Sequence, residues 1–155
     1  MKPHPNTEVL TGDAALSRMP EVALLAAQVF ADDDDFATLP AEAAEKPGLT
    51  LLLALEGERA VGFKLGYRRS PDTFYSWLGG VHPQARGQGA ARRLMEEQHA
   101  WLREQGYRFV TTETFNRYRD MLLLNIRMGF EVVGTLTTLK GDTKVILRKP
   151  LAPLQ

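Results

Sequence analysis

The sequence contains no cysteine among its 155 residues. This absence excludes a disulfide, a thiolate-bound metal and a cysteine nucleophile. Its three histidines, His4, His82 and His99, are too scattered to show metal-ligand spacing, so we expect no metal site. The formal net charge is zero, because 19 basic residues balance 19 acidic ones. We therefore expect neither a nucleic-acid partner nor a membrane partner.

Long apolar runs are absent as well. The polar start of the chain leads into no run of signal-peptide length, and no stretch approaches the length of a membrane span. We therefore expect a cytoplasmic protein. Hydrophobic residues make up 44% of the chain and charged residues 25%, as in ordinary globular proteins, and 155 residues can bury a substantial core. Since no repeat or linker interrupts the sequence, we predict a single domain over residues 1–155.

Apolar periodicity and turn residues divide the chain into strands and helices. The predicted elements are a strand at 7–10, helices at 20–30 and 40–46, strands at 49–56, 59–69 and 74–81, a helix at 89–105, a strand at 108–114, a helix at 120–128, and strands at 131–139 and 143–149. Gly79-Gly80, inside a predicted strand, indicates a bulge or a close approach by another backbone or a ligand. This order of elements predicts an α+β fold with helices packed on a mixed sheet.

The most informative stretch is the turn before the long predicted helix, Arg86-Gly87-Gln88-Gly89-Ala90-Ala91. Its two glycines leave the backbone bare, so a ligand can approach the N–H groups closely. The helix that follows brings unpaired N–H donors and the positive end of its dipole to the same point. An anion such as a phosphate is the expected ligand. A tight turn that merely begins a helix is the competing interpretation.

Two common phosphate-binding motifs do not fit this turn. A P-loop requires a lysine after its last glycine, and none follows Gly89. A dinucleotide-binding fingerprint requires a third glycine where Arg92 stands, and here a meander strand precedes the turn. The remaining pattern is Arg-x-x-Gly-x-Ala, with Val81-His82-Pro83 before it and an apolar helix ending in Gly129-Phe130 after it. With these features, nearly the whole chain resembles the GCN5-related N-acetyltransferase (GNAT) family of acyl-CoA-dependent proteins.

The resemblance implies a fold and a co-substrate. The fold is a GNAT-like mixed, mostly antiparallel sheet of six to seven strands, flanked by about four helices, with splayed fourth and fifth strands. The co-substrate is acetyl-CoA, whose pyrophosphate would lie on the glycine turn and whose pantetheine arm would pair with the strand before it. Arg92 or Arg93 could reach its 3′-phosphate. The residues expected to bind the coenzyme are Gly80, Val81, Arg86, Gly87, Gln88, Gly89, Ala90, Ala91, Asn116, Arg119 and Asn125.

The catalytic groups are less clearly implied. Many family members carry a tyrosine four residues before the final Gly-Phe, where it protonates the leaving thiolate, but this chain has Asn125. An amide cannot give up a proton, so Asn125 is expected either to donate a hydrogen bond in catalysis or to bind the coenzyme. In the second case solvent would protonate the thiolate, which needs little help as a leaving group of low pKa. Asn116 has a competing role as a helix cap or Asx turn. Glu113 is the candidate general base, although an exposed ion-paired glutamate would look the same.

Three further features bear on the acceptor. Tyr75 and Trp77 share one strand face and could line the acceptor pocket, although core packing is the simpler interpretation. The aspartate run Asp32–Asp35 could attract a cationic amine or simply form a solvated turn. His82 is expected to be structural or exposed.

We therefore predict an N-acetyltransferase that moves acetyl from acetyl-CoA to a primary amine by direct attack in a ternary complex. The acceptor is a small-molecule or protein amine that the sequence does not identify. No covalent intermediate is expected, since there is no cysteine and no activated serine. The alternatives are a non-catalytic acyl-CoA-binding GNAT-like module and, third, a nucleotide-binding regulator. The resemblance also allows a homodimer.

Overall fold

A computed structural model describes residues 6–30 and 36–152, so the aspartate run Asp32–Asp35 lies outside the described residues. The elements are β1 (Thr7–Thr11), α1 (Gly12–Leu16), α2 (Met19–Val29), α3 (Leu39–Ala44), β2 (Thr50–Glu56), β3 (Arg59–Ser70), β4 (Thr73–Val81), the 3₁₀ turn η1 (Pro83–Ala85), α4 (Ala90–Glu104), β5 (Phe109–Phe115), α5 (Arg119–Arg127), β6 (Glu131–Thr137) and β7 (Thr143–Pro150). Each predicted element is present with its boundaries shifted by only a few residues, and α1 is an additional short helix.

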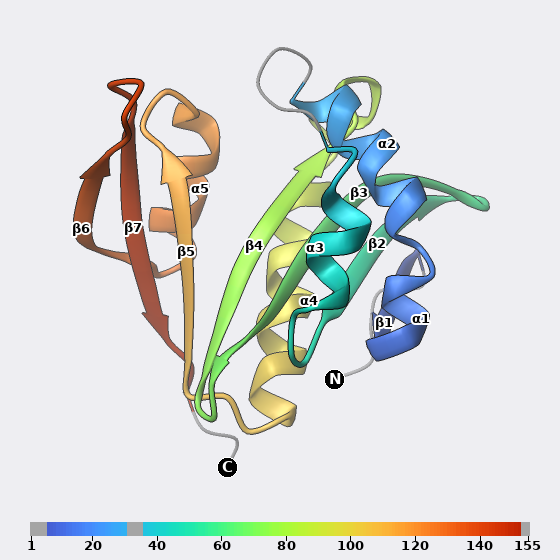
Figure 1. The fold of residues 1–155 in the computed structure, drawn as a ribbon, viewed down its shortest axis with the longest axis horizontal. Coiled ribbons are helices and arrows are strands. Elements are labelled where there is room, and N and C mark those ends of the chain that lie inside the picture. The colour runs from blue at the N-terminus through green and yellow to red at the C-terminus, as the bar shows by residue number, and fades with distance from the viewer. Residues whose placement is uncertain (1–5, 31–35, 153–155) are drawn as a thin grey trace.

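The strands form one mixed sheet in the order β1-β2-β3-β4-β5-β7-β6. All neighbouring pairs are antiparallel except β4 and β5, which run parallel. The β4–β5 ladder joins only residues 73–76 to residues 109–112, and beyond Ser76 and Thr112 the two strands diverge (Figure 1). This confirms the predicted sheet and its splayed fourth and fifth strands. We call the end of the ladder, at Ser76 and Thr112, the vertex of the splay.

Helices cover both faces of the sheet, which is why β2 is buried along most of its length. Leu51 and Leu53 pack with α1, α2 and α3 on one face, whereas Leu52 and Ala54 pack with α4 on the other. α5 lies on the α4 face, where its apolar residues join a cluster around Phe74. No helix in the described ranges is long and apolar enough to cross a membrane.

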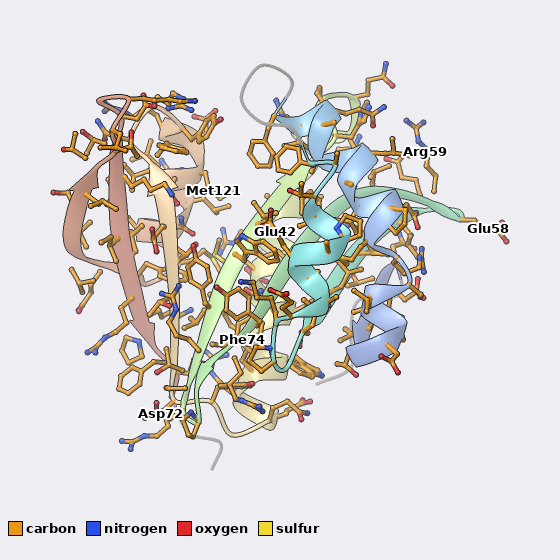
Figure 2. All side chains as sticks on the ribbon, viewed as in Figure 1. Glu42, Glu58, Arg59, Asp72, Phe74 and Met121 are labelled. Atoms are coloured by element: carbon orange, nitrogen blue, oxygen red, sulfur yellow. The ribbon has the colours of Figure 1, made fainter. Side chains whose placement is uncertain are left out.

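The closed end of the splay is fixed by the β3–β4 turn. The Asp72 carbonyl accepts hydrogen bonds from the N–H groups of Arg108 and Phe109, at 2.8 and 3.0 Å. Figure 2 shows Phe74 near this closed end and Met121, on α5, beside the open end. The open end is therefore bordered by the last residues of β4 and by the β5–α5 connection.

β4 contains a bulge, but not at the predicted glycines. In the β3–β4 ladder Leu65 pairs with Leu78 and Gly66 with Ser76, which leaves Trp77 as the extra residue, next to the vertex. Gly80 instead accommodates a close approach, because a Cβ there would lie 2.4 Å from Val29 Cγ1. The group that approaches Gly80 is a side chain of α2.

Candidate active site

The turn between β4 and α4 is held by its own side chains. His82 Nδ1 accepts a hydrogen bond from the Gln84 N–H at 3.1 Å, which caps η1 and confirms a structural role for this histidine. Arg86 Nε donates to the Val81 carbonyl at 3.0 Å. The arginine of the motif thus stabilises the turn through a hydrogen bond to the end of β4.

Gly87 and Gly89 have φ angles of +82° and +77°, in the region that favours glycine. Apart from adjacent residues of the chain, no heavy atom lies within 4 Å of a Cβ built at either position, so packing does not require these glycines. Gly89 is the N-cap of α4 and supplies no capping side chain. The N–H groups of Ala90 and Ala91 begin a 15-residue helix behind this exposed turn, and the geometry suits an anion.

Among the described strands, the segment of β4 from Leu78 to Val81 pairs with β3 alone. The His82 N–H donates to the Val61 carbonyl of β3, and antiparallel ladders alternate along a strand. The backbone groups of Gly80 therefore face β3, whereas those of Gly79 and Val81 face the free edge. Because Arg86 already occupies the Val81 carbonyl, Gly79 and the Val81 N–H are left to pair with an added strand.

A cluster of buried polar side chains surrounds the vertex on the α4 face. Thr112 Oγ1 donates to the Ser76 carbonyl at 2.9 Å, while Lys64 Nζ and Gln98 Nε2 each lie 3.4 Å from Ser76 Oγ. His99 Nδ1 lies 3.0 Å from Lys149 Nζ. Burial lowers the pKa of Lys64 to about 8. Burial, and then neighbouring cations, lower the pKa of His99 to about 2.

This cluster was not predicted, although the sequence contains a signal for three of its members. Lys64 interrupts an apolar strand between Phe63 and Leu65. Gln98 and His99 stand four residues after Leu94 and Met95, on the inward side of the long helix.

Asn125 lies beyond the vertex on the same face of the sheet. It is buried, and its Nδ2 donates to Thr114 Oγ1 at 3.1 Å. The Asn125 carbonyl accepts from the Phe130 N–H at 3.0 Å. The side chain therefore ties α5 to β5, which gives it a structural contact whether or not it also contacts a ligand.

Glu113 lies on the opposite face of β5. Thr112 and Thr114 point towards α4 and α5, so the intervening Glu113 points towards α2 and α3. Burial, and then the Glu113 charge, raise the pKa of Tyr75 to about 12, so the two side chains are neighbours. The two candidate catalytic residues, Glu113 and Asn125, thus lie on different faces of the sheet, with the splay between them.

Tyr75 and Trp77 belong to an aromatic cluster on the Glu113 face. The Tyr67 ring contacts both edge-on, with ring centroids 5.4 and 5.7 Å apart. Lys46 Nζ lies 5.0 Å from the Tyr67 ring and 5.5 Å from the Trp77 ring. Tyr75 is buried and Trp77 half-buried, so the cluster combines core packing with a partly open aromatic surface beside the vertex.

Asn116 and Arg119 lie at the open end of the splay. The Asn116 N–H donates to the Thr143 carbonyl at 2.9 Å, and the N-cap of α5 is Tyr118, so Asn116 is not the helix cap. Arg119 is exposed in the first turn of α5. On α4, Arg92 is paired with Glu96 at 2.8 Å along the helix surface.

A hollow on the described surface is separate from this site. It has a volume of about 760 Å³ and lies beside the C-terminal half of α4, where Glu97 and Trp101 face Leu49 and Tyr107. None of the residues that line it belongs to the glycine turn or the splay, so we assign the site from backbone donors and strand geometry. Nowhere in the ranges 6–30 and 36–152 do three or more potential metal ligands cluster.

Comparisons with known proteins agree with this geometry. The profile of the Acetyltransferase (GNAT) family matches residues 17–130. The ribosomal-protein-S18-alanine N-acetyltransferase of Escherichia coli has a similar fold, with a TM-score of 0.79 at 15% identity over 96% of each chain. Ard1 from Thermoplasma volcanium gives a TM-score of 0.77 at 16% identity over 95% of this chain and 99% of its own.

A third structure is a GNAT family acetyltransferase from Elizabethkingia anophelis with acetyl-CoA bound, whose TM-score is 0.70 at 15% identity over 96% of this chain and 100% of its own. At these identities the structures establish the shared fold alone. No curated protein matches the chain in sequence. The family profile spans well over half of the chain, and the chain therefore belongs to the GNAT family of acetyltransferases.

Proposed function

We propose that this protein is an N-acetyltransferase that moves acetyl from acetyl-CoA to a primary amine by direct attack in a ternary complex. The observation that carries the proposal is the continuity of three features. Along β4 and the turn after it, three features follow one another: a bulge at the vertex, a free strand edge, and a helix N-terminus with two glycines and no capping side chain. Family members whose structures contain acetyl-CoA support this choice of co-substrate.

Each feature would bind one part of acetyl-CoA. The N–H groups from Gln88 to Ala91 would hold the pyrophosphate, aided by the helix dipole. Gly79 and the Val81 N–H would pair with the amides of the pantetheine arm, as an added strand pairs with a sheet edge. Trp77, which the bulge leaves without a partner in β3, places its backbone beside the vertex, where an N–H could stabilise the oxyanion that forms when the thioester is attacked.

The amine would approach from the α2/α3 face. Glu113 lies there, beside Tyr75, and as a carboxylate it could take the proton that the attacking nitrogen must lose. The aromatic cluster of Tyr67, Tyr75 and Trp77 already lies against the Lys46 ammonium, so this surface can receive a cationic amine. The acceptor would then reach the carbonyl carbon from one face while the thiolate leaves towards the other.

A second candidate is a module that binds acyl-CoA without turnover. Asn125, at the position where many relatives have a tyrosine, already donates its amide to Thr114, which favours this alternative. Release of free thiol from acetyl-CoA, measured with a panel of small amines and peptides, separates the two. Thiol release that depends on an amine supports the enzyme, whereas a rise in Tm with coenzyme A and no release with any amine supports the module. If coenzyme A does not raise the Tm, both candidates fail.

A further inference from the structure

Lys64 is a buried cation beside Ser76. Its residue is 8% exposed, and Ser76 Oγ, at 3.4 Å, is the hydrogen-bond partner of its ammonium. Among residues 6–30 and 36–152, no carboxylate forms an ion pair with it. Burying an uncompensated ammonium is expensive, and a fold keeps one where an anion arrives or where function requires it. Burial also lowers the pKa of Lys64 to about 8, so its side chain is protonated at neutral pH and gives up its proton more readily than an exposed lysine does.

The side chain of Lys64 leads to the vertex of the splay. Lys64 pairs with Gly79 in the β3–β4 ladder, and its Cγ and Cε lie 3.5 and 3.6 Å from where a Cβ of Gly79 would be. The side chain therefore crosses the bare backbone of Gly79 and ends beside Ser76, the last residue of β4 that pairs with β5. The ammonium lies where the free edge of β4 begins.

The groups around the ammonium do not neutralise it. His99 faces the cluster from α4 and Lys149 from β7, and both are cationic or neutral, while β2, β4 and β5 contribute Leu52, Ser76 and Thr112. Two buried atoms at the same place, Gln98 Oε1 and His99 Nε2, have no hydrogen-bond partner in the described parts of the chain. Incompletely satisfied polar atoms around a buried cation indicate a site for a ligand.

We propose that the Lys64 ammonium receives the thiolate that leaves when the thioester of acetyl-CoA is attacked. This inference rests on the proposed function. Lys64 lies on the α4 face, which also holds the glycine turn, whereas an acceptor approaching Glu113 comes from the other face. The thiolate is therefore the anion that the geometry brings to it.

The step balances as a simple transfer. The amine nitrogen forms a bond to the acetyl carbon and loses one proton to Glu113 or water. The carbon–sulfur bond breaks, sulfur leaves with the electron pair, and the thiolate takes a proton from Lys64 Nζ. Solvent then returns a proton to the neutral lysine after coenzyme A departs. In this way Lys64 supplies the proton that Asn125 cannot give.

The test compares binding of coenzyme A with binding of desulfo-coenzyme A, which lacks only the thiol. In calorimetry between pH 7 and pH 9, the wild-type protein should bind coenzyme A more tightly, by about tenfold or more once the bound thiol ionises. The thiolate absorbance of bound coenzyme A should appear at lower pH than that of free coenzyme A. Lys64→Met should lose both effects. Lys149→Met, a control that removes a neighbouring cation outside the vertex, should keep them.

Equal binding of the two analogues by the wild type, or an unchanged preference in Lys64→Met, would overturn the role of Lys64. The wild-type comparison decides the question even where Lys64→Met does not fold. Absence of binding to both analogues would instead overturn the proposed function itself, so the two failures are distinguishable.

Discussion

The effect of Gly89→Val on stability can be separated from its effect on the binding of the proposed ligand. Gly89 has a φ of +77°, and apart from adjacent residues of the chain no heavy atom lies within 4 Å of a Cβ built there. The substitution should therefore cost only the strain of a left-handed backbone, roughly 1–3 kcal/mol. A domain of this size loses about 2–4 °C in Tm for each kcal/mol, so the protein should still fold. The new side chain would stand in front of the first N–H groups of α4, where the pyrophosphate is proposed to bind.

Gly141→Val is the matched control. Gly141 has a φ of +87° and equally open surroundings, but it lies in the β6–β7 turn. Both variants should lose similar stability in thermal melts. Only Gly89→Val should weaken binding of coenzyme A in calorimetry, by about 10- to 100-fold for the loss of one hydrogen bond to a charged group. If the two variants bind coenzyme A equally well, the glycine turn is not the phosphate site.

Four further substitutions test the interior of the site. Glu113→Gln removes the proposed base, and kcat/KM should fall about 10²- to 10⁴-fold while the Kd for acetyl-CoA in calorimetry is unchanged. Asn125→Ala leaves Thr114 Oγ1 without its donor, so the free energy of unfolding in urea should fall by about 1–3 kcal/mol. His99, with its pKa lowered to about 2, stays neutral in the fold while the unfolded chain binds a proton below about pH 6.5. Its contribution to stability should therefore fall on acidification below that pH, by about 1.4 kcal/mol per pH unit, and His99→Gln should remove this slope in urea titrations. The pKa of Lys64 is lowered to about 8 in the fold, whereas the unfolded chain keeps this proton up to about pH 10.4. At pH 7 the fold therefore bears the full cost of burying the charge, and Lys64→Met should raise the free energy of unfolding by roughly 3 kcal/mol. As the pH rises above 8 the buried lysine becomes neutral, so this gain should be lost by about pH 10.4.

For each of these predictions, a different result would contradict the reasoning. Undiminished turnover in Glu113→Gln would mean that water or another group takes the proton. The Asn125→Ala and Thr114→Val losses should be less than additive when combined, and full additivity would contradict their coupling. A wild-type protein as stable at pH 4 as at pH 6.5 would contradict a neutral His99. A Lys64→Met protein less stable than the wild type at pH 7 would mean that the buried ammonium already has a compensating partner.

The glycine turn was predictable because its determinants are neighbours in the sequence. Gly87 and Gly89 are the residues that a left-handed backbone favours, and they stand directly before a strongly amphipathic helix. The strands and long helices were predictable from periodicity for the same reason. α1 was missed because five residues are too few for a periodic pattern, and Gly12 at its start looked like the end of the preceding strand.

The vertex cluster could not be predicted, because its members come together only through tertiary structure. Lys64, Ser76, Gln98 and Thr112 come from three strands and a helix, so they are far apart in the sequence. Which face each strand residue occupies depends on the register, and the bulge at Trp77 shifts that register by one residue next to the vertex. A bulge depends on the pairing of two strands, so inspection of one strand placed it wrongly at Gly79-Gly80.

The division of the site between two faces of the sheet limits how the reaction can proceed. Glu113 and the aromatic cluster lie on the α2/α3 face, whereas Lys64 and the glycine turn lie on the α4 face. A continuous sheet would keep a base on one face from acting on a thioester bound from the other. β4 and β5 are no longer paired beyond Ser76 and Thr112, so a thioester bound between them, as proposed, would be accessible from both faces. In the proposed mechanism, the proton leaving the amine and the proton reaching the thiolate would travel on opposite sides of the sheet. One proton donor beside the sulfur would then be sufficient, and that donor need not be a residue of α5.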